Sequence, residues 1–211
     1  MKRWVLLVIV VYAACLAVLA ALPMRYLNND EFESFRTLSA YAAPVLIFSQ
    51  AVLLLVPLAS MQERPVKRRT ILMSTVVGAI PMTAMAIGFL WSILIMILRD
   101  DAFNDPARWW MLATFAISWL VWGTVFWRSS DPASLTSTIT HWLLRGSILE
   151  LVVAIPSHII SRNRNDCCAP TFTLWGISLG LATALMSFGP GLFFLFARRI
   201  RDKQRASSAR R

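Results

Sequence analysis

The chain has 211 residues, of which 57% are hydrophobic and only 15% are charged, and its mean hydropathy is +0.61. Soluble domains carry about 25% charged residues, and their apolar residues recur in stripes rather than long blocks. The composition therefore argues against a soluble domain and favours an integral membrane protein. The formal net charge is +10, but the basic residues flank apolar segments, as membrane topology requires. We expect no nucleic-acid partner.

Six segments are apolar enough to cross a bilayer, which takes about 20 mostly apolar residues. In chain order they cover residues 4–22, 38–58, 71–98, 109–126, 141–160 and 172–196. The third is longer than one perpendicular crossing requires, and Pro81 inside it predicts a kinked or tilted helix. The fifth is the weakest because Arg145 and Glu150 interrupt it, which leaves open whether it spans fully. We predict an all-α polytopic bundle of six transmembrane helices over residues 1–197, without a separate soluble domain.

The distribution of charge predicts how the six spans are oriented. With the N-terminus inside, the inner regions hold 14 basic and three acidic residues, whereas the outer loops hold six basic and seven acidic residues. Basic residues gather on the cytoplasmic side of membrane proteins, so both termini are predicted to be cytoplasmic. We predict a multi-pass protein of the inner membrane whose basic tail, residues 198–211, lies against anionic lipid.

The first segment also has the order of a signal peptide, with Lys2 and Arg3 before an apolar run that ends in small residues. Its run of about 19 residues exceeds the usual 7–15-residue apolar core of a signal peptide. A retained first helix is therefore the preferred interpretation.

Small residues recur every four positions on three of the predicted helices, as in close helix–helix contacts in membranes. They are Gly176, Gly180 and Ala184 on the sixth, Ala13, Ala17 and Ala21 on the first, and Ala84, Gly88 and Ser92 on the third. Small residues are also common in any membrane helix, so a packing role and a neutral one stay open. The chain is short for a transporter and has no internal repeat, so we expect a homo-oligomer or a place in a larger membrane complex.

The fifth segment concentrates the ionisable residues of the apolar part of the chain. On a helical wheel its polar and small residues share one side, opposite an apolar stripe. The polar and small residues are Gly146, Ser147, Glu150, Ala154, Ser157 and His158. The apolar stripe consists of Leu144, Leu151 and Ile155. The polar side is predicted to face the bundle, because a charged group facing lipid is costly.

Glu150 is the centre of the predicted intramembrane polar site, together with Arg145, Ser147 and Ser157. Arg145 precedes it by five residues, about 140° round the helix, so it is no i,i+4 partner. We expect a partner from another helix instead. Two interpretations remain open: Glu150 binds a proton or another cation, or it is a hydrogen-bonded anchor that holds the helices together.

A second candidate site lies at the outer end of the same segment, where His158 is followed by Cys167 and Cys168. One histidine and two thiols are suitable ligands for Zn²⁺ or Cu⁺. Alternatively, the cysteines form a strained, reducible disulfide, with Arg162 and Arg164 favouring the thiolate. A purely structural pair that braces the Pro170 turn is also open.

Charged residues of the outer loops form a third feature. Arg162, Arg164 and Asp166 are expected to join the acidic outer loops in a salt-bridged cap, although exposed ion pairs contribute less than about 1 kcal/mol each. The chain has no phosphate-binding glycine loop and no hydrolase or haem-attachment motif. The sequence predicts an accessory subunit or a small transport or conducting protein that uses Glu150, with a metal or thiol-redox protein as the alternative.

Overall fold

The computed structural model describes residues 2–24, 29–61, 68–98, 105–128, 135–164 and 169–208. Within these ranges it describes the side chains of all residues except 2–4, 29–32, 55–61, 105–108, 136 and 189–208. The described part is all-helical. Its six helices are α1 (Lys2–Met24), α2 (Asn29–Met61), α3 (Arg68–Leu98), α4 (Asp105–Arg128), α5 (Leu135–Asn163) and α6 (Ala169–Ser208).

Each of the six predicted segments falls within one of these helices, so the all-α prediction is confirmed. All six helices are long and apolar enough to cross a membrane. The weak fifth segment is no exception, because α5 is one helix of 29 residues that includes Arg145 and Glu150. The α3 helix likewise continues through Pro81.

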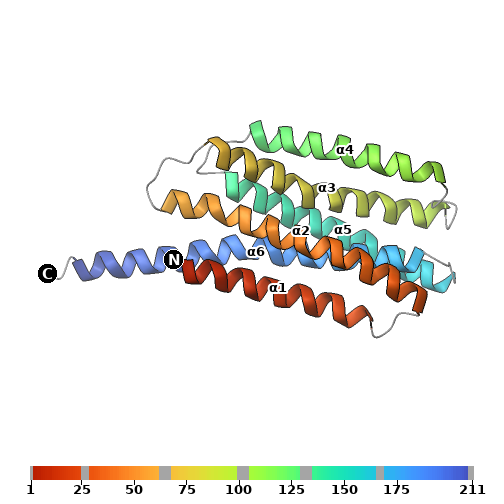
Figure 1. The fold of residues 1–211 in the computed structure, drawn as a ribbon, viewed down its shortest axis with the longest axis horizontal. Helices are drawn as coiled ribbons and strands as arrows, with labels where there is room; N and C mark the ends of the chain where they lie inside the picture. Colours follow the sequence, from red (N-terminus) through yellow and green to blue (C-terminus); the bar gives the residue numbers. More distant parts are fainter. Residues whose placement is uncertain are drawn as a thin grey trace.

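Successive helices run antiparallel to one another (Figure 1). As a result, α1 begins and α6 leaves the bundle at the same end, which we call the terminal end. The α2 and α4 helices also end, and α3 and α5 begin, at the terminal end, whereas α1, α3 and α5 end and α2, α4 and α6 begin at the opposite end. A chain that crosses a layer six times in succession has this arrangement.

The α5 helix lies in the middle of the bundle and packs mainly against α3 and α6, whereas α1 and α4 lie at its margins (Figure 1). Each marginal helix donates one side-chain hydrogen bond to a central helix. The Tyr12 hydroxyl donates to the Ala182 carbonyl at 3.1 Å, and the Trp119 indole donates to the Val76 carbonyl at 3.1 Å. A hydrogen bond of this kind contributes about 0.5–1.5 kcal/mol, so the two bonds help to hold the margins in register.

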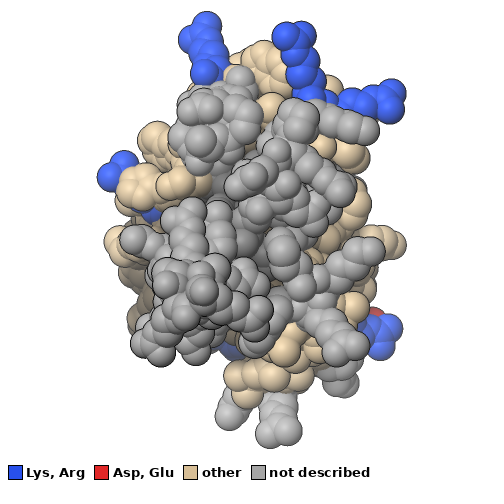
Figure 2. All heavy atoms as spheres, turned by 90° about the vertical axis from the view of Figure 1, so that its left-hand side faces the viewer, with Lys and Arg blue, Asp and Glu red and all other residues tan. Residues whose placement is uncertain are grey.

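The α6 helix has 40 residues, about 60 Å at 1.5 Å per residue, and it extends beyond the bundle (Figure 1). It continues to Ser208, so most of the segment predicted as a basic tail prolongs the last helix. Figure 2 views the terminal end and shows basic side chains along its upper rim. There α3 begins with Arg68 and Arg69, and α4 ends with Arg128; all three are exposed.

Candidate functional site

The side chain of Glu150 lies fully buried, at 0% exposure, between α5 and two glycines of neighbouring helices. A Cβ atom added to Gly88 of α3 would overlap Glu150 Oε1 and lie 3.1 Å from its Cδ. A Cβ atom added to Gly176 of α6 would lie 3.5 Å from the same Oε1. The carboxyl group therefore occupies space that exists because α3 presents a glycine there, and it also lies next to a glycine of α6.

Serine side chains close this site on the side of the opposite end. Ser157, seven residues after Glu150 on α5, donates a hydrogen bond of 2.9 Å to the Ser92 carbonyl of α3. The Ser92 Oγ lies 3.9 Å from the position of a Gly176 Cβ. Because Gly88 and Ser92 are one helical turn apart, the same face of α3 receives both Glu150 and Ser157.

Methionine and leucine side chains close the site toward the terminal end. The position of a Gly146 Cβ lies 3.0 Å from Met85 Cε and 3.4 Å from Met82 Cε, so these two side chains of α3 lie against α5 one turn before Glu150. On α6, the position of a Gly180 Cβ lies 3.1 Å from Leu151 Cγ. The walls on this side are apolar and tightly packed.

The packing of Leu151 corrects the wheel drawn from the sequence, which placed it on the face away from the bundle. The α5 helix contacts α3 on one side and α6 on another, so its buried arc is wider than the polar stripe and includes Leu151. Ile155 is exposed, as expected, and the outward face also includes Ile148, Leu149, Val152 and Ile159.

Neither carboxyl oxygen of Glu150 has a hydrogen-bond partner among the described residues. The expected partner from another helix is therefore absent from the part of the chain that the structure describes. Arg145 does not join the site either: it is exposed, and its guanidinium lies over the Trp142 ring at 5.9 Å from the centroid. The Ser147 hydroxyl is buried but donates to the Leu144 carbonyl of its own helix at 2.8 Å.

The His158 side chain, near the end of α5, contacts residues at the start of α6. Its Nδ1 lies 3.0 Å from Thr173 Oγ1 and 3.1 Å from the Pro170 carbonyl. Cys167 and Cys168 lie outside the described residues, so the predicted metal or redox site stays a prediction. The described residues contain no group of three or more His, Cys, Asp or Glu side chains that is suited to a metal ion.

The predicted outer-loop charge cluster is described only in part. Arg164 donates from Nη1 to the Met96 carbonyl at the end of α3, at 3.1 Å, and Arg162 is exposed. Asp166 lies outside the described residues. Glu33 and Arg36, near the start of α2, form an exposed ion pair of 3.2 Å, which contributes less than about 1 kcal/mol.

Three further buried polar side chains were not singled out from the sequence. They are Gln50 on α2 and Ser74 and Thr83 on α3, each at most 1% exposed, and their side-chain polar atoms have no described hydrogen-bond partner. An amide such as Gln50 within a long apolar run is a sequence signal, because buried polar groups are costly. Ser74 and Thr83 give no comparable signal, since hydroxyl residues are common in membrane helices.

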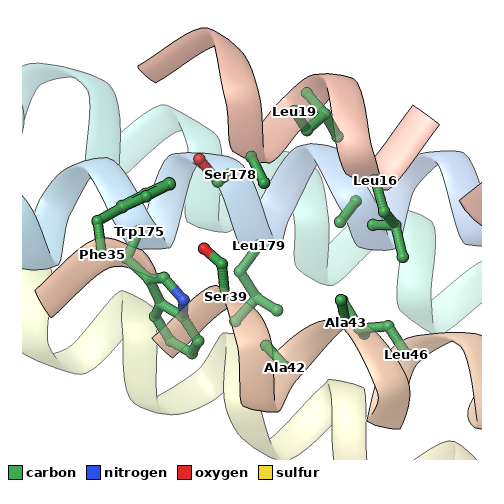
Figure 3. A pocket seen from close by; sticks show the side chains of 12 residues that line it. Leu16, Leu19, Phe35, Ser39, Ala42, Ala43, Leu46, Trp175, Ser178 and Leu179 are labelled. Atoms are coloured by element: carbon green, nitrogen blue, oxygen red, sulfur yellow. The ribbon is translucent and has the colours of Figure 1, made fainter. Parts of the chain in front are cut away.

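A groove lies on the other side of α6, between α6, α1 and α2. Figure 3 shows mainly apolar side chains around it, with the hydroxyls of Ser39 and Ser178 between Phe35, Trp175 and Leu179. The lining includes no ionisable side chain, so the groove provides no acid–base chemistry.

No family model matches this chain, and no curated protein or solved structure matches it. The functional argument therefore depends on the chemistry of the described residues. Glu150 is the strongest candidate because its buried carboxyl group lacks both a hydrogen bond and an opposite charge among those residues.

Proposed function

We propose that this chain is a small multi-pass protein of the inner membrane in which Glu150 binds a proton or another small cation that crosses the membrane. Six helices of sufficient length and apolarity support the membrane location. The excess of basic residues in regions at the terminal end supports a cytoplasmic position for that end. The observation that carries the proposed transport is the complete burial of Glu150, whose two carboxyl oxygens have no hydrogen-bond partner among the described residues.

The alternative of a structural anchor has less support from the geometry. An anchoring carboxyl group stabilises a bundle through hydrogen bonds to neighbouring helices, and an unpaired buried polar group costs about 1–3 kcal/mol instead. Glu150 has no such bond to a described residue, whereas Ser157 on the same helix does bond α5 to α3. An acid that weakens the packing around it is better explained by a function that requires its charge to change.

The short chain favours an assembly of several copies, or a role as a subunit of a larger membrane complex. The side chains around Glu150 come from α3, α5 and α6 of one chain, so the site itself requires no second copy. The marginal helices α1 and α4 leave most of their surface uncovered, and the proposed partners for these surfaces are lipid, further copies or other subunits.

The proposal is tested with purified protein in lipid vesicles, by measuring the flux of protons and of Na⁺ and K⁺ under an imposed membrane potential. The Glu150→Gln variant keeps the size of the side chain but removes the charge, and we expect it to lower the flux at least tenfold. Circular dichroism and gel filtration are expected to remain unchanged, because the variant introduces no overlap.

The matched control is Glu33→Gln, which removes an exposed carboxylate paired with Arg36. This variant is expected to keep its flux within about twofold of the wild type, since exposed pairs contribute little. Vesicles of wild-type protein that carry no ion above the background of empty vesicles, or a Glu150→Gln variant with normal flux, would contradict the proposal.

A further inference from the structure

The α3 helix approaches the Glu150 carboxyl group closely. A single methyl group added to Gly88 would overlap Oε1. On the α6 side, the position of a Gly176 Cβ lies 3.5 Å from Oε1, 3.7 Å from Ala154 Cβ and 3.9 Å from Ser92 Oγ. Among these contacts, Ser92 Oγ is the one polar atom besides the carboxyl group itself.

The site is also poor in ligands for a metal ion. Ca²⁺ takes about six to eight oxygen ligands, and Mg²⁺ takes about six in strict octahedral geometry. The hydroxyl groups of Ser157 and Ser147 donate to carbonyl groups, so only the lone pairs of their oxygens could face a cation. Most carbonyl groups accept hydrogen bonds within a helix; an exception in α5 is the Val152 carbonyl, because Pro156 has no N–H to donate to it. One carboxylate with so few available oxygens cannot replace the hydration shell of Na⁺, K⁺ or a divalent cation.

The remaining walls offer no compensation for a carboxylate or a cation. Met85 and Met82 beside Gly146, and Leu151 beside Gly180, bring thioether and aliphatic atoms next to the site. Thioether sulfur suits soft metal ions such as Cu⁺ rather than Na⁺, K⁺ or Mg²⁺. Burying an isolated ionised carboxylate is very costly, whereas the neutral acid is much easier to accommodate.

We infer that the ion taken up and released by Glu150 is a proton, because the described residues at the junction of α3, α5 and α6 offer Na⁺, K⁺ and divalent cations such as Mg²⁺ and Ca²⁺ too few oxygen ligands. A proton neutralises the carboxyl group and requires no further ligand. This inference rests on the proposed function, and it narrows the transported ion from a small cation to H⁺.

The flux test separates the inference from the proposed function. In vesicles with an outward or inward gradient of one ion at a time, the wild-type protein is expected to carry protons at least tenfold faster than Glu150→Gln. Flux of Na⁺ and of K⁺ is expected to be the same for these two proteins, and Glu33→Gln is expected to behave as wild type. A Na⁺ or K⁺ flux that depends on Glu150 overturns the inference but leaves the proposed function standing. The loss of any flux dependent on Glu150 overturns both.

A second measurement does not depend on transport. The infrared difference spectrum between wild-type protein and Glu150→Gln is expected to contain the C=O stretch of a protonated carboxyl group, shifted in D₂O. Separate additions of NaCl, KCl and CaCl₂ are expected to leave this band unchanged, because a site closed to metal ions cannot exchange its proton for one. A band that disappears when one of these salts is added would refute the assignment of H⁺ as the ligand.

Discussion

The close approach of Gly88 to Glu150 makes Gly88→Ala the most informative single substitution in the bundle. The added methyl group would overlap Glu150 Oε1 and lie 3.1 Å from Cδ. The end of a glutamate side chain is flexible in general, but this one is fully buried. Overpacking of this kind costs about 1–3 kcal/mol.

The overlap has to be separated from the intrinsic preference of helices for alanine, which favours the substitution by up to about 1 kcal/mol. Gly123 on α4 provides the matched control, because a Cβ atom there would meet nothing within 4 Å. We expect Gly123→Ala to be neutral or slightly stabilising. The difference in unfolding free energy between the two variants then isolates the overlap, at about 1–3 kcal/mol.

The assay is equilibrium unfolding in mixed detergent micelles, followed by circular dichroism as the denaturing detergent fraction is raised. A third variant, Glu150→Ala, and the double variant Gly88→Ala/Glu150→Ala complete a cycle. Shortening Glu150 removes the overlapping atoms, so the cost of Gly88→Ala is expected to vanish in that background, with a coupling of about 1–3 kcal/mol. The reasoning is refuted if Gly88→Ala is as stable as Gly123→Ala, or if its cost persists after Glu150 is truncated.

Two further predictions concern the helix contacts and the orientation of the chain. Ser157→Ala removes the bond from α5 to α3 and is expected to lower the unfolding free energy by about 0.6–1.5 kcal/mol. Ser147→Ala, which removes a bond within α5, is expected to cost less, and an equal or larger cost would contradict this ranking. In a cysteine-free background, Ser137→Cys and Asn163→Cys place exposed thiols near the two ends of α5, about 39 Å apart at 1.5 Å per residue. An impermeant maleimide on intact cells is expected to label only Asn163→Cys, and labelling of Ser137→Cys instead would reverse the predicted orientation.

The number and approximate limits of the helices were predictable from local composition alone. Long apolar runs separated by short polar segments leave no other regular structure that satisfies the backbone in an apolar surrounding, and each predicted run lies in one observed helix. The polar side of α5 was also predictable, since Glu150 and Ser157 share one face by their spacing. The helix ends were less accurate: α2 and α6 extend well beyond their apolar runs, because hydropathy marks the apolar part of a helix and not its polar continuation.

The contacts of the site were decided by the tertiary structure. Gly88 and Gly176 are far from Glu150 in the sequence, and only the packing of α3 and α6 against α5 brings them to the carboxyl group. In the part of the chain that the structure describes, the same packing gave Glu150 no partner from another helix and turned Leu151 toward α6. Sequence periodicity describes one helix at a time, so it identifies a buried face but not the helices that cover it. The sequence by itself therefore determined that a carboxyl group lies inside an apolar helix, and the assembly of three helices decided that it lies against glycines of α3 and α6 without a hydrogen-bond partner among the described residues.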